Sequence, residues 1–337
     1  MVNILVFPNL YNGSALNEVS FGLVREIKKY NLDVKIIGFN LPMTTLSNGK
    51  LDNPEIFFQH NKKIVDELKE TIQEGDKILF VDMFQLGLGI LQYYLSGTGK
   101  NVKFGALLHG ASFIEGDFYK KDKWIKNFER GIIDLMEIIY MPSKYYAEYF
   151  KKEVKNNKVK VLPFGFYPQD YKKNLDNSCK EYDVIIPHRW SWDKGPKYFY
   201  ELAKNMPDIK FALCGDILEL EDKKLIELFQ KITSLKNVVK LGIKTDEPHY
   251  EDLRKARVVI AVRDSFGYGF RKAMACGCIP VLKNTTCFPE YIPKEYLFDT
   301  LDEAERLIRK YVKDYPRNYL PTKEYSFIEI LEDFFRR

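Results

Sequence analysis

The chain has 337 residues and a mass of 39.6 kDa, which corresponds to two domains at about 150 residues each. Hydrophobic residues make up 45% and charged residues 29% of the chain, a globular composition that excludes a disordered tail and a fibrous repeat. The net charge of +5 at pH 7 permits an anionic ligand but is too small for a strongly basic nucleic-acid-binding surface.

The chain carries no signal for a disulfide framework, a metal or a membrane. The sequence contains five cysteines, at Cys179, Cys214, Cys276, Cys278 and Cys287. They form no CxxC pair and no zinc spacing with histidine, so we expect reduced thiols and no metal site. The start of the chain lacks a basic segment, and the longest apolar stretch, 78–95, is broken by polar residues and two glycines. We therefore expect no signal peptide, no transmembrane segment and a cytoplasmic location.

Short apolar runs alternate with amphipathic stretches along the whole chain, which indicates βαβ units and a mostly parallel sheet. In the first half, the predicted strands are 3–8, 34–39 and 77–82, and the predicted helices are 14–30 and 62–75, the latter ended by Gly75. The pattern continues through 102–110, 132–143 and 158–165. These residues predict one doubly wound, Rossmann-like domain over 1–168.

Residues 166–182 are polar and turn-rich, so we place the domain boundary there. The alternation then restarts, with predicted strands at 183–187, 209–214, 237–241, 257–262 and 279–282. The predicted helices are 196–204, 221–231, 249–255 and 268–276, followed by two closing helices at 301–314 and 324–336. We expect a second Rossmann-like domain over 180–320 and a C-terminal helix in 321–337 that can pack back on the first domain.

Two doubly wound α/β domains joined by a short linker predict a cleft between them. Ligands of such folds bind at the carboxyl ends of parallel strands, so functional residues should follow strands.

Two loops of the first half fit this expectation. Gly13 and Ser14 lie between the first strand and a helix, where backbone amides can meet an anion or a sugar hydroxyl; a plain turn is the alternative. The loop matches neither GxxxxGK[ST] nor GxGxxG, which argues against a P-loop and a dinucleotide site. His109 follows an apolar strand and should face a ligand, with a structural histidine as the alternative.

Two segments of the second half predict a phosphate site. Arg189 and Lys194 flank a loop that follows a strand and opens a helix, so they can clamp a diphosphate; a solvated surface loop is the alternative. The glycines of Gly267-Tyr268-Gly269 let a phosphate approach backbone amides at the start of the next helix.

Several segments of the chain occur together in a recognisable order. They are the Gly/Ser loop, PSKYYAEYF, VLPFGFYPQDY, HRWSWDKG, FALCGD and SFGYGFRKAMACGCIPVL. In this order they resemble the family-four group of glycosyltransferases, which have the GT-B fold, use nucleotide sugars and retain the anomeric configuration. PHRW, ACGCIPVL and residues 284–297 are similar to the branch of this group that puts mannose on queuosine in tRNA.

The resemblance implies roles in donor binding. Arg189 and Lys194 would hold the donor diphosphate, and the amides of 267–269 would lie near the same phosphates. A nucleotide sugar, such as a UDP- or GDP-sugar, is then the substrate. No cofactor is expected, and no metal, because two cations and a helix dipole take the charge.

The resemblance also implies that His109 and Asp264 are the catalytic residues, with His109 contacting the donor sugar. Gly13 and Ser14 would border the reaction centre.

One position departs from the family pattern. The family carries two glutamates separated by seven residues, and the corresponding positions hold Asp264 and Lys272. The second family glutamate binds ribose hydroxyls, and lysine cannot accept those hydrogen bonds. The donor is then held differently, or the chain is an inactive relic that binds a nucleotide or nucleic acid.

We expect a retaining glycosyltransferase whose acceptor is a modified base in DNA or tRNA. A saccharide or a lipid carrier is the alternative acceptor. A basic and aromatic stretch, with Lys120, Lys121, Lys123, Lys126 and Arg130, can track a phosphate backbone or an anionic membrane, or be a solvated helix face.

Overall fold

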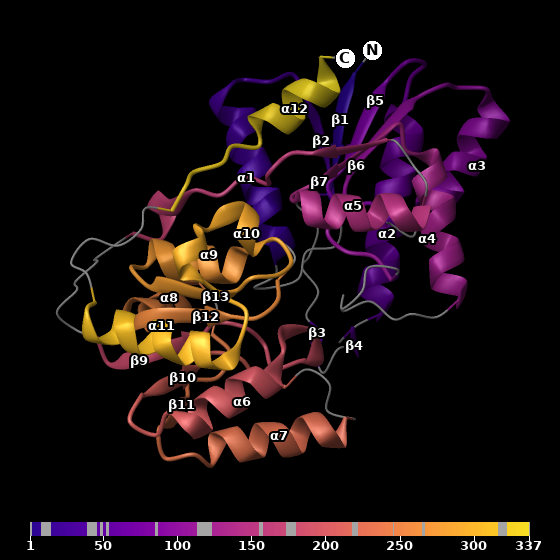
Figure 1. Cartoon of the computed structure of the whole chain (residues 1–337). Helices are drawn as coiled ribbons and strands as arrows, with labels where there is room; N and C mark the ends of the chain where they lie inside the picture. Colours follow the sequence, from indigo (N-terminus) through magenta and orange to yellow (C-terminus); the bar gives the residue numbers. More distant parts are fainter. Residues whose placement is uncertain are drawn as a thin grey trace. The chain divides into compact units, whose positions relative to one another are not determined.

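The computed structural model divides the chain into two compact units (Figure 1). The first unit consists of Met1–Gly165 and Tyr325–Arg337, and the second of Phe166–Glu324. The structure describes residues 2–7, 15–38, 46–47, 50–51, 54–84, 87–112, 123–154, 158–172, 180–217, 222–244, 246–264, 267–315 and 322–336.

The first unit is built on a parallel sheet in the order β2-β1-β5-β6-β7-β8. Its strands are β1 (Asn3–Val6), β2 (Lys35–Ile37), β5 (Lys77–Phe80), β6 (Lys103–Leu107), β7 (Ile138–Met141) and β8 (Val159–Val161). The short strands β3 (Leu46–Ser47) and β4 (Lys50–Leu51) form a separate antiparallel pair. The strand order reverses between β1 and β5, which makes this the switch point where doubly wound sheets bind ligands.

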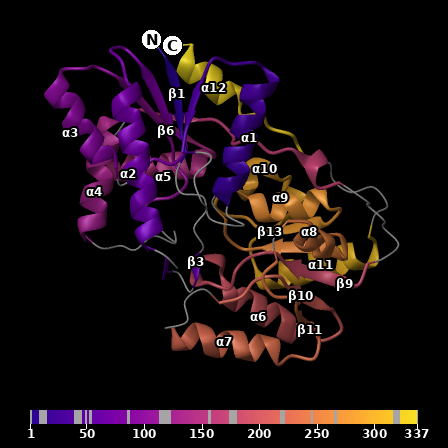
Figure 2. The ribbon, with the colours of Figure 1, turned by 180° about the vertical axis from the view of Figure 1, so that it is seen from behind.

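Helices cover both faces of this sheet. One face carries α2 (Pro54–Thr71), α3 (Leu88–Thr98), α4 (Lys123–Leu135) and α5 (Lys144–Val154). The other face carries α1 (Ala15–Lys29) and α12 (Ile328–Phe335), which lie next to each other in Figures 1 and 2. Successive strand residues point to opposite faces, so Ile78 and Phe80 pack among the first set of helices and Leu79 points to the second.

The last helix is fixed to the first unit by specific contacts. The carboxylate of Asp333 accepts hydrogen bonds from Tyr140 Oη at 2.7 Å and from Lys160 Nζ at 2.5 Å. Gly105 of β6 lies directly under the ring of Phe334, where a Cβ atom would stand 2.4 Å from Cε2. The chain thus returns to its first unit after completing the second.

The second unit has its own parallel sheet, in the order β11-β10-β9-β12-β13-β14. Its strands are β9 (Tyr182–Ile186), β10 (Phe211–Leu213), β11 (Val238–Lys240), β12 (Ala256–Ala261), β13 (Ile279–Lys283) and β14 (Leu297–Phe298). The order reverses between β9 and β12, so the switch point of this sheet lies between those two strands.

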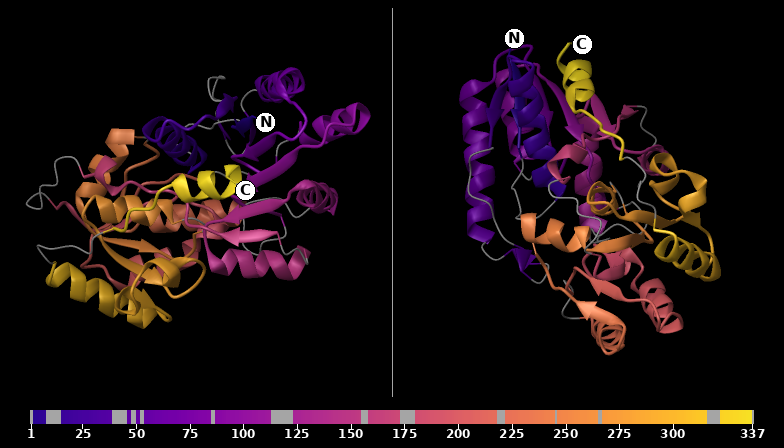
Figure 3. Two further views of the ribbon diagram at one scale, coloured as in Figure 1. Left: turned by 90° about the horizontal axis from the view of Figure 1, so that it is seen from above. Right: turned by 90° about the vertical axis from the view of Figure 1, so that its left-hand side faces the viewer.

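Helices also cover both faces of the second sheet. The helices α6 (Pro196–Asn205), α7 (Lys223–Thr233) and α11 (Leu301–Lys313) pack on the face that Val258 and Ile260 present. The helices α8 (Asp246–Arg254) and α9 (Tyr268–Ala275) pack against each other and against β12. Figure 3 shows α11, in gold, along one side of this sheet. The short helices are α10 (Phe288–Tyr291) and the 3-10 turns η1 (Pro168–Asp170), η2 (Trp192–Lys194) and η3 (Lys294–Tyr296).

The predicted fold class, two doubly wound α/β sheets, is confirmed, but some predicted bounds are wrong. The helix predicted at 62–75 begins at Pro54 and ends at Thr71. Proline is well accommodated in the first helical turn, and Gly75, with φ of +81°, lies in the turn that follows. The helix predicted at 324–336 begins only at Ile328, whose amide donates to Ser326 Oγ. The helix α5 and the strand β14 lie outside the predicted elements.

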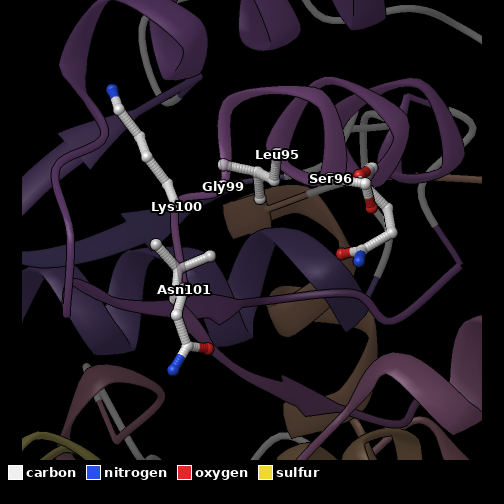
Figure 4. A pocket seen from close by; sticks show the side chains of 7 residues that line it. Leu95, Ser96, Gly99, Lys100 and Asn101 are labelled. Carbon is white, nitrogen blue, oxygen red and sulfur yellow. The ribbon is translucent and has the colours of Figure 1, made fainter.

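A hollow in the first unit lies at the end of α3 (Figure 4). Its lining residues are Gln92, Leu95, Ser96, Gly99, Lys100, Asn101 and Val102. These residues precede β6, so the hollow lies at the amino edge of the sheet, away from the strand ends where we expect the site. No helix in the described part of the chain is long and apolar enough to cross a membrane.

Candidate functional site

The predicted phosphate-binding residues of the second unit lie at the switch point of its sheet. One loop follows β9 and the other follows β12, and these two strands are paired. Gly195 brings the loops close together, because a Cβ atom there would stand 2.8 Å from Val262 Cγ1. Gly195 has a φ of +72°, a conformation that favours glycine, and Pro196 then begins α6.

The two loops bring basic and acidic side chains into contact. Lys194 Nζ lies 3.2 Å from Asp264 Oδ1 and 3.5 Å from Asp193 Oδ2. Arg189 Nη2 lies 2.9 Å from Asp193 Oδ2. The side chains of Lys194 and Asp264 are 11% and 10% exposed, whereas that of Arg189 is 31% exposed. The structure therefore brings the predicted site residues Arg189, Lys194 and Asp264 together, around a fourth residue, Asp193, for which the sequence analysis gave no role.

That fourth residue, Asp193, carries a charge in the folded protein. Burial raises the pKa of its carboxyl group, but Lys194, Arg189 and the hydrogen bond from Ser191 outweigh burial, so the net pKa lies below its usual value. Two carboxylates thus face two cations in this group. A carboxylate four residues after Arg189 and directly before Lys194 was the available sequence signal.

The first turn of α9 lies beside this group. Gly267, with φ of +72°, precedes the helix, and Tyr268 is buried. A Cβ atom on Gly269 would stand 2.8 Å from Cε1 of His188, so only glycine lets the helix approach that ring without displacing it. Burial lowers the pKa of His188 to about 4, which leaves its imidazole uncharged at neutral pH. Free amides at a helix start attract anions.

Lys272, the residue that departs from the family pattern, is held against aromatic rings. Its Nζ lies 5.7 Å from the ring centroid of Tyr171 and 5.6 Å from that of Tyr250. Cation–π contacts of this kind stabilise a partly buried ammonium group. Lys272 also affects His249, whose pKa is lowered to about 4 by burial first and by this cation second.

His109, in the first unit, is buried where the chain leaves β6. Its Nε2 lies 2.7 Å from the carbonyl oxygen of Val81, and its ring centroid lies 5.3 Å from that of Phe164. Burial lowers the pKa of His109 to about 4, so the imidazole is uncharged at neutral pH. In this state the imidazole can donate one hydrogen bond and accept another, but it does not supply a positive charge.

A buried carboxylate anchors the loop that contains His109. Glu129 Oε1 and Oε2 accept hydrogen bonds from the amide of Ser112 at 2.9 and 3.1 Å, and Oε2 also accepts one from Ser112 Oγ at 2.5 Å. Glu129 lies on α4, within the basic and aromatic stretch, while Lys123, Trp124 and Arg130 are exposed there. Sequence reasoning missed Glu129 because its neighbours are basic.

Asp82 is a second missed residue of the first unit. It lies two residues after the end of β5, at the switch point of the first sheet. Burial raises the pKa of Asp82 to about 6, although backbone hydrogen bonds from Phe84 and Met83 act in the opposite direction. A polar residue at the end of an apolar run that is predicted as a strand is the signal that could have identified it.

The Gly/Ser loop and part of the basic stretch lie where the structure gives no description. Gly13 and Ser14 lie outside the described residues, as do Lys120 and Lys121. Within the described ranges, no group of three or more His, Cys, Asp or Glu side chains is placed to hold a metal ion.

Comparisons with known proteins relate the second unit to glycosyl transferases. Residues 169–323 match the family model for glycosyl transferases group 1. The chain is 24% identical over 209 residues to the tRNA-queuosine alpha-mannosyltransferase of Drosophila melanogaster. The aligned residues make up 60% of this chain and 51% of that protein. The chain thus spans about half the length of this curated relative.

Solved structures share the fold of the whole chain. Sucrose-phosphate synthase from Thermosynechococcus elongatus matches with a TM-score of 0.67 and 15% identity, covering 93% of this chain and 90% of its own. An alpha,alpha-trehalose-phosphate synthase (UDP-forming) from Burkholderia vietnamiensis matches with a TM-score of 0.64 and 12% identity, covering 94% of this chain and 92% of its own. The chain therefore has the GT-B fold, and residues 169–323 of its second unit match the glycosyl transferases group 1.

Proposed function

We propose that this chain is a glycosyltransferase that moves a sugar from a nucleoside-diphosphate sugar to an acceptor hydroxyl with retention of configuration. The observation that carries the proposal is the pair of cations, Arg189 and Lys194, beside the start of α9 at the switch point of the second sheet. Cations and helix-start amides stabilise a departing diphosphate, which is the charge that develops in this reaction.

In the proposed reaction, the bond between the anomeric carbon and the diphosphate oxygen breaks, and a bond to the acceptor oxygen forms on the same face of the sugar. The leaving phosphate oxygen takes the proton from the acceptor hydroxyl. Arg189, Lys194 and the amides of 267–269 hold the diphosphate, and Asp264 contacts the donor sugar. His109 also contacts this sugar, as a neutral hydrogen-bonding group. No cofactor and no metal take part.

We propose a modified base in DNA or tRNA as the acceptor, with Gly13 and Ser14 bordering the reaction centre. Similarity to a tRNA-queuosine alpha-mannosyltransferase supports this choice. Exposed residues of α4 also support it, because Trp124, Lys123 and Arg130 are all exposed on this helix, and exposed cations with an aromatic ring suit a nucleic acid. A saccharide or lipid-carrier acceptor is the alternative within the same reaction.

A second candidate function is that of an inactive relic that binds a nucleotide or nucleic acid without turnover. Lys272 favours it, because a cation held by Tyr171 and Tyr250 offers no carboxylate to ribose hydroxyls.

Nucleotide binding is the first test. A ligand that binds only the folded state raises the melting temperature, so UDP, GDP, ADP, CDP, TDP and their sugars can be compared in one thermal-shift panel. We expect a shift with one of the nucleotides and loss of that shift in Arg189→Ala and Lys194→Ala. A shift that survives in the double variant would contradict the diphosphate site, and no shift with any nucleotide would contradict the proposal.

Transfer is the second test. The donor that binds is incubated with tRNA, DNA, saccharide and lipid-carrier acceptors, and the sugar is followed into the product. Binding with neither transfer nor donor hydrolysis would favour the relic.

A further inference from the structure

Asp193 contacts both cations of the candidate phosphate site, Arg189 and Lys194. Its carboxylate accepts a hydrogen bond from Arg189 Nη2 at 2.9 Å and one from Ser191 Oγ, and Lys194 Nζ lies 3.5 Å away. The side chain is 13% exposed, and Ser191 is fully buried. One oxygen atom, Oδ2, faces both cations.

The surrounding backbone holds this carboxylate in place. Asp193 belongs to the 3-10 turn η2, which closes with a hydrogen bond from the Gly195 amide to the Trp192 carbonyl oxygen at 3.2 Å. The indole of Trp192 donates to Asp222 Oδ2 at 2.6 Å, and Asp222 also caps α7. The position of Asp193 is therefore set by neighbouring elements before any ligand binds.

We propose that Asp193 is a positioning residue that holds Arg189 and Lys194 in the arrangement that binds the two phosphates of a nucleoside diphosphate. The inference rests on the proposed function of this site. The side chain of Arg189 is 31% exposed, and Lys194 lies against both Asp193 and Asp264. A long side chain that is already held in place loses less conformational entropy when a ligand binds it.

The opposite role, competition with the ligand, gives an effect of opposite sign. If Asp193 only repelled phosphate, removing its charge would tighten the binding of a nucleoside diphosphate, because like charges repel across a few ångströms. If Asp193 positions the cations, removing its charge weakens binding even though the site becomes more positive. The direction of the change in affinity therefore separates the two roles.

The experiment is isothermal titration of UDP and of GDP into the full chain and its variants. We expect Asp193→Asn, which keeps the shape of the side chain, to bind at least about tenfold more weakly than the unsubstituted protein, about 1.4 kcal/mol. Unchanged or tighter binding would overturn the inference. If Asp193→Asn does not fold, Ser191→Ala removes one donor from the same carboxylate and should weaken binding by about threefold.

Two further variants make the outcome specific. Asp208→Asn is the matched control, because Asp208 pairs with Arg309 at 2.5 Å in the turn before β10, at the amino edge of the same sheet. It should bind the nucleotide normally. Lys194→Ala separates the inference from the proposed function. If Lys194→Ala loses binding and Asp193→Asn does not, the inference alone fails; if Lys194→Ala binds normally, or the unsubstituted protein binds neither nucleotide, the proposed function fails.

Discussion

Replacing Gly105 by alanine should destabilise the first unit, because β6 passes directly under Phe334 of α12. A Cβ atom at Gly105 would stand 2.4 Å from Cε2 and 2.8 Å from Cδ2 of that ring. Phe334 is only 4% exposed, so in a closely packed interior the ring cannot move away without cost. Overpacking of this kind costs about 1 to 3 kcal/mol, and we expect about 2 kcal/mol for Gly105→Ala.

The cost should disappear when the ring is absent. Phe334→Ala alone should cost about 4 kcal/mol, because it empties a buried site. In that background the methyl group added by Gly105→Ala enters vacated space, and replacing a strand glycine then gains about 0.5 kcal/mol in chain entropy. The coupling energy between the two positions is therefore about 2.5 kcal/mol, far above the error of a double-mutant cycle.

Urea unfolding of the four proteins, followed by circular dichroism, measures this cycle. Gly131→Ala on α4 is the control, because a Cβ atom there has no neighbour within 4 Å, and a helical glycine replaced by alanine should gain up to about 1 kcal/mol. Equal costs of Gly105→Ala in both backgrounds would refute the packing of α12 on β6.

Three further predictions concern buried and half-buried charges. Glu129→Ala should lower the free energy of unfolding by about 3 kcal/mol, because it leaves the amide and hydroxyl of Ser112 without this acceptor. Glu129→Gln should lower it by about 1 kcal/mol. Urea unfolding that shows no difference between the two variants would contradict this prediction. His109 has a folded pKa of about 4 against 6.5 when unfolded, so the folded state binds fewer protons between these values and stability falls as pH falls through that window. Between pH 7 and pH 5 the free energy of unfolding of His109→Gln should therefore fall by about 2 kcal/mol less than that of the unsubstituted protein. An equal fall in both proteins would refute a neutral buried imidazole. Lys272→Glu removes the nearby cation that lowers the pKa of His249, so the pKa of His249 measured by NMR titration should rise. An unchanged pKa would show that Lys272 does not lie near His249.

Much of the fold could be predicted from alternating apolar and amphipathic segments. The strands predicted at 183–187 and 257–262 agree with β9 and β12 to within one residue, because each is a buried apolar run bounded by polar residues. The sequence led us to expect a C-terminal helix in 321–337 that can pack back on the first domain, but it could not show which strand of that domain the helix covers, because an apolar helix face does not reveal its partner strand. Gly105 identifies the receiving strand only once the two are seen together.

The candidate site was predicted in part for the same reason. Arg189, Lys194 and Asp264 lie in loops that follow buried strands, so their sequence positions place them at the edge of a sheet. Asp193 was not singled out, because an acidic residue beside cations in a loop is usually a surface pair. Its role depends on burial, which reflects tertiary packing and not the local sequence.

Asp82 shows that a switch-point residue can be kept at the expense of stability. Its folded pKa of about 6 exceeds the unfolded value of 3.8, so the folded state binds more protons between these values and stability falls as pH rises through that window. The ionised carboxylate therefore costs up to about 3 kcal/mol at neutral pH.

Asp82→Asn has the same shape without the charge, so it should raise the free energy of unfolding at pH 7 and leave it nearly unchanged at pH 4. Urea unfolding at both pH values tests this, and an equal effect at both would contradict a buried ionised group. A charge that destabilises the fold at a switch point is expected of a functional residue, so the same variant should lose the proposed transfer activity while it gains stability.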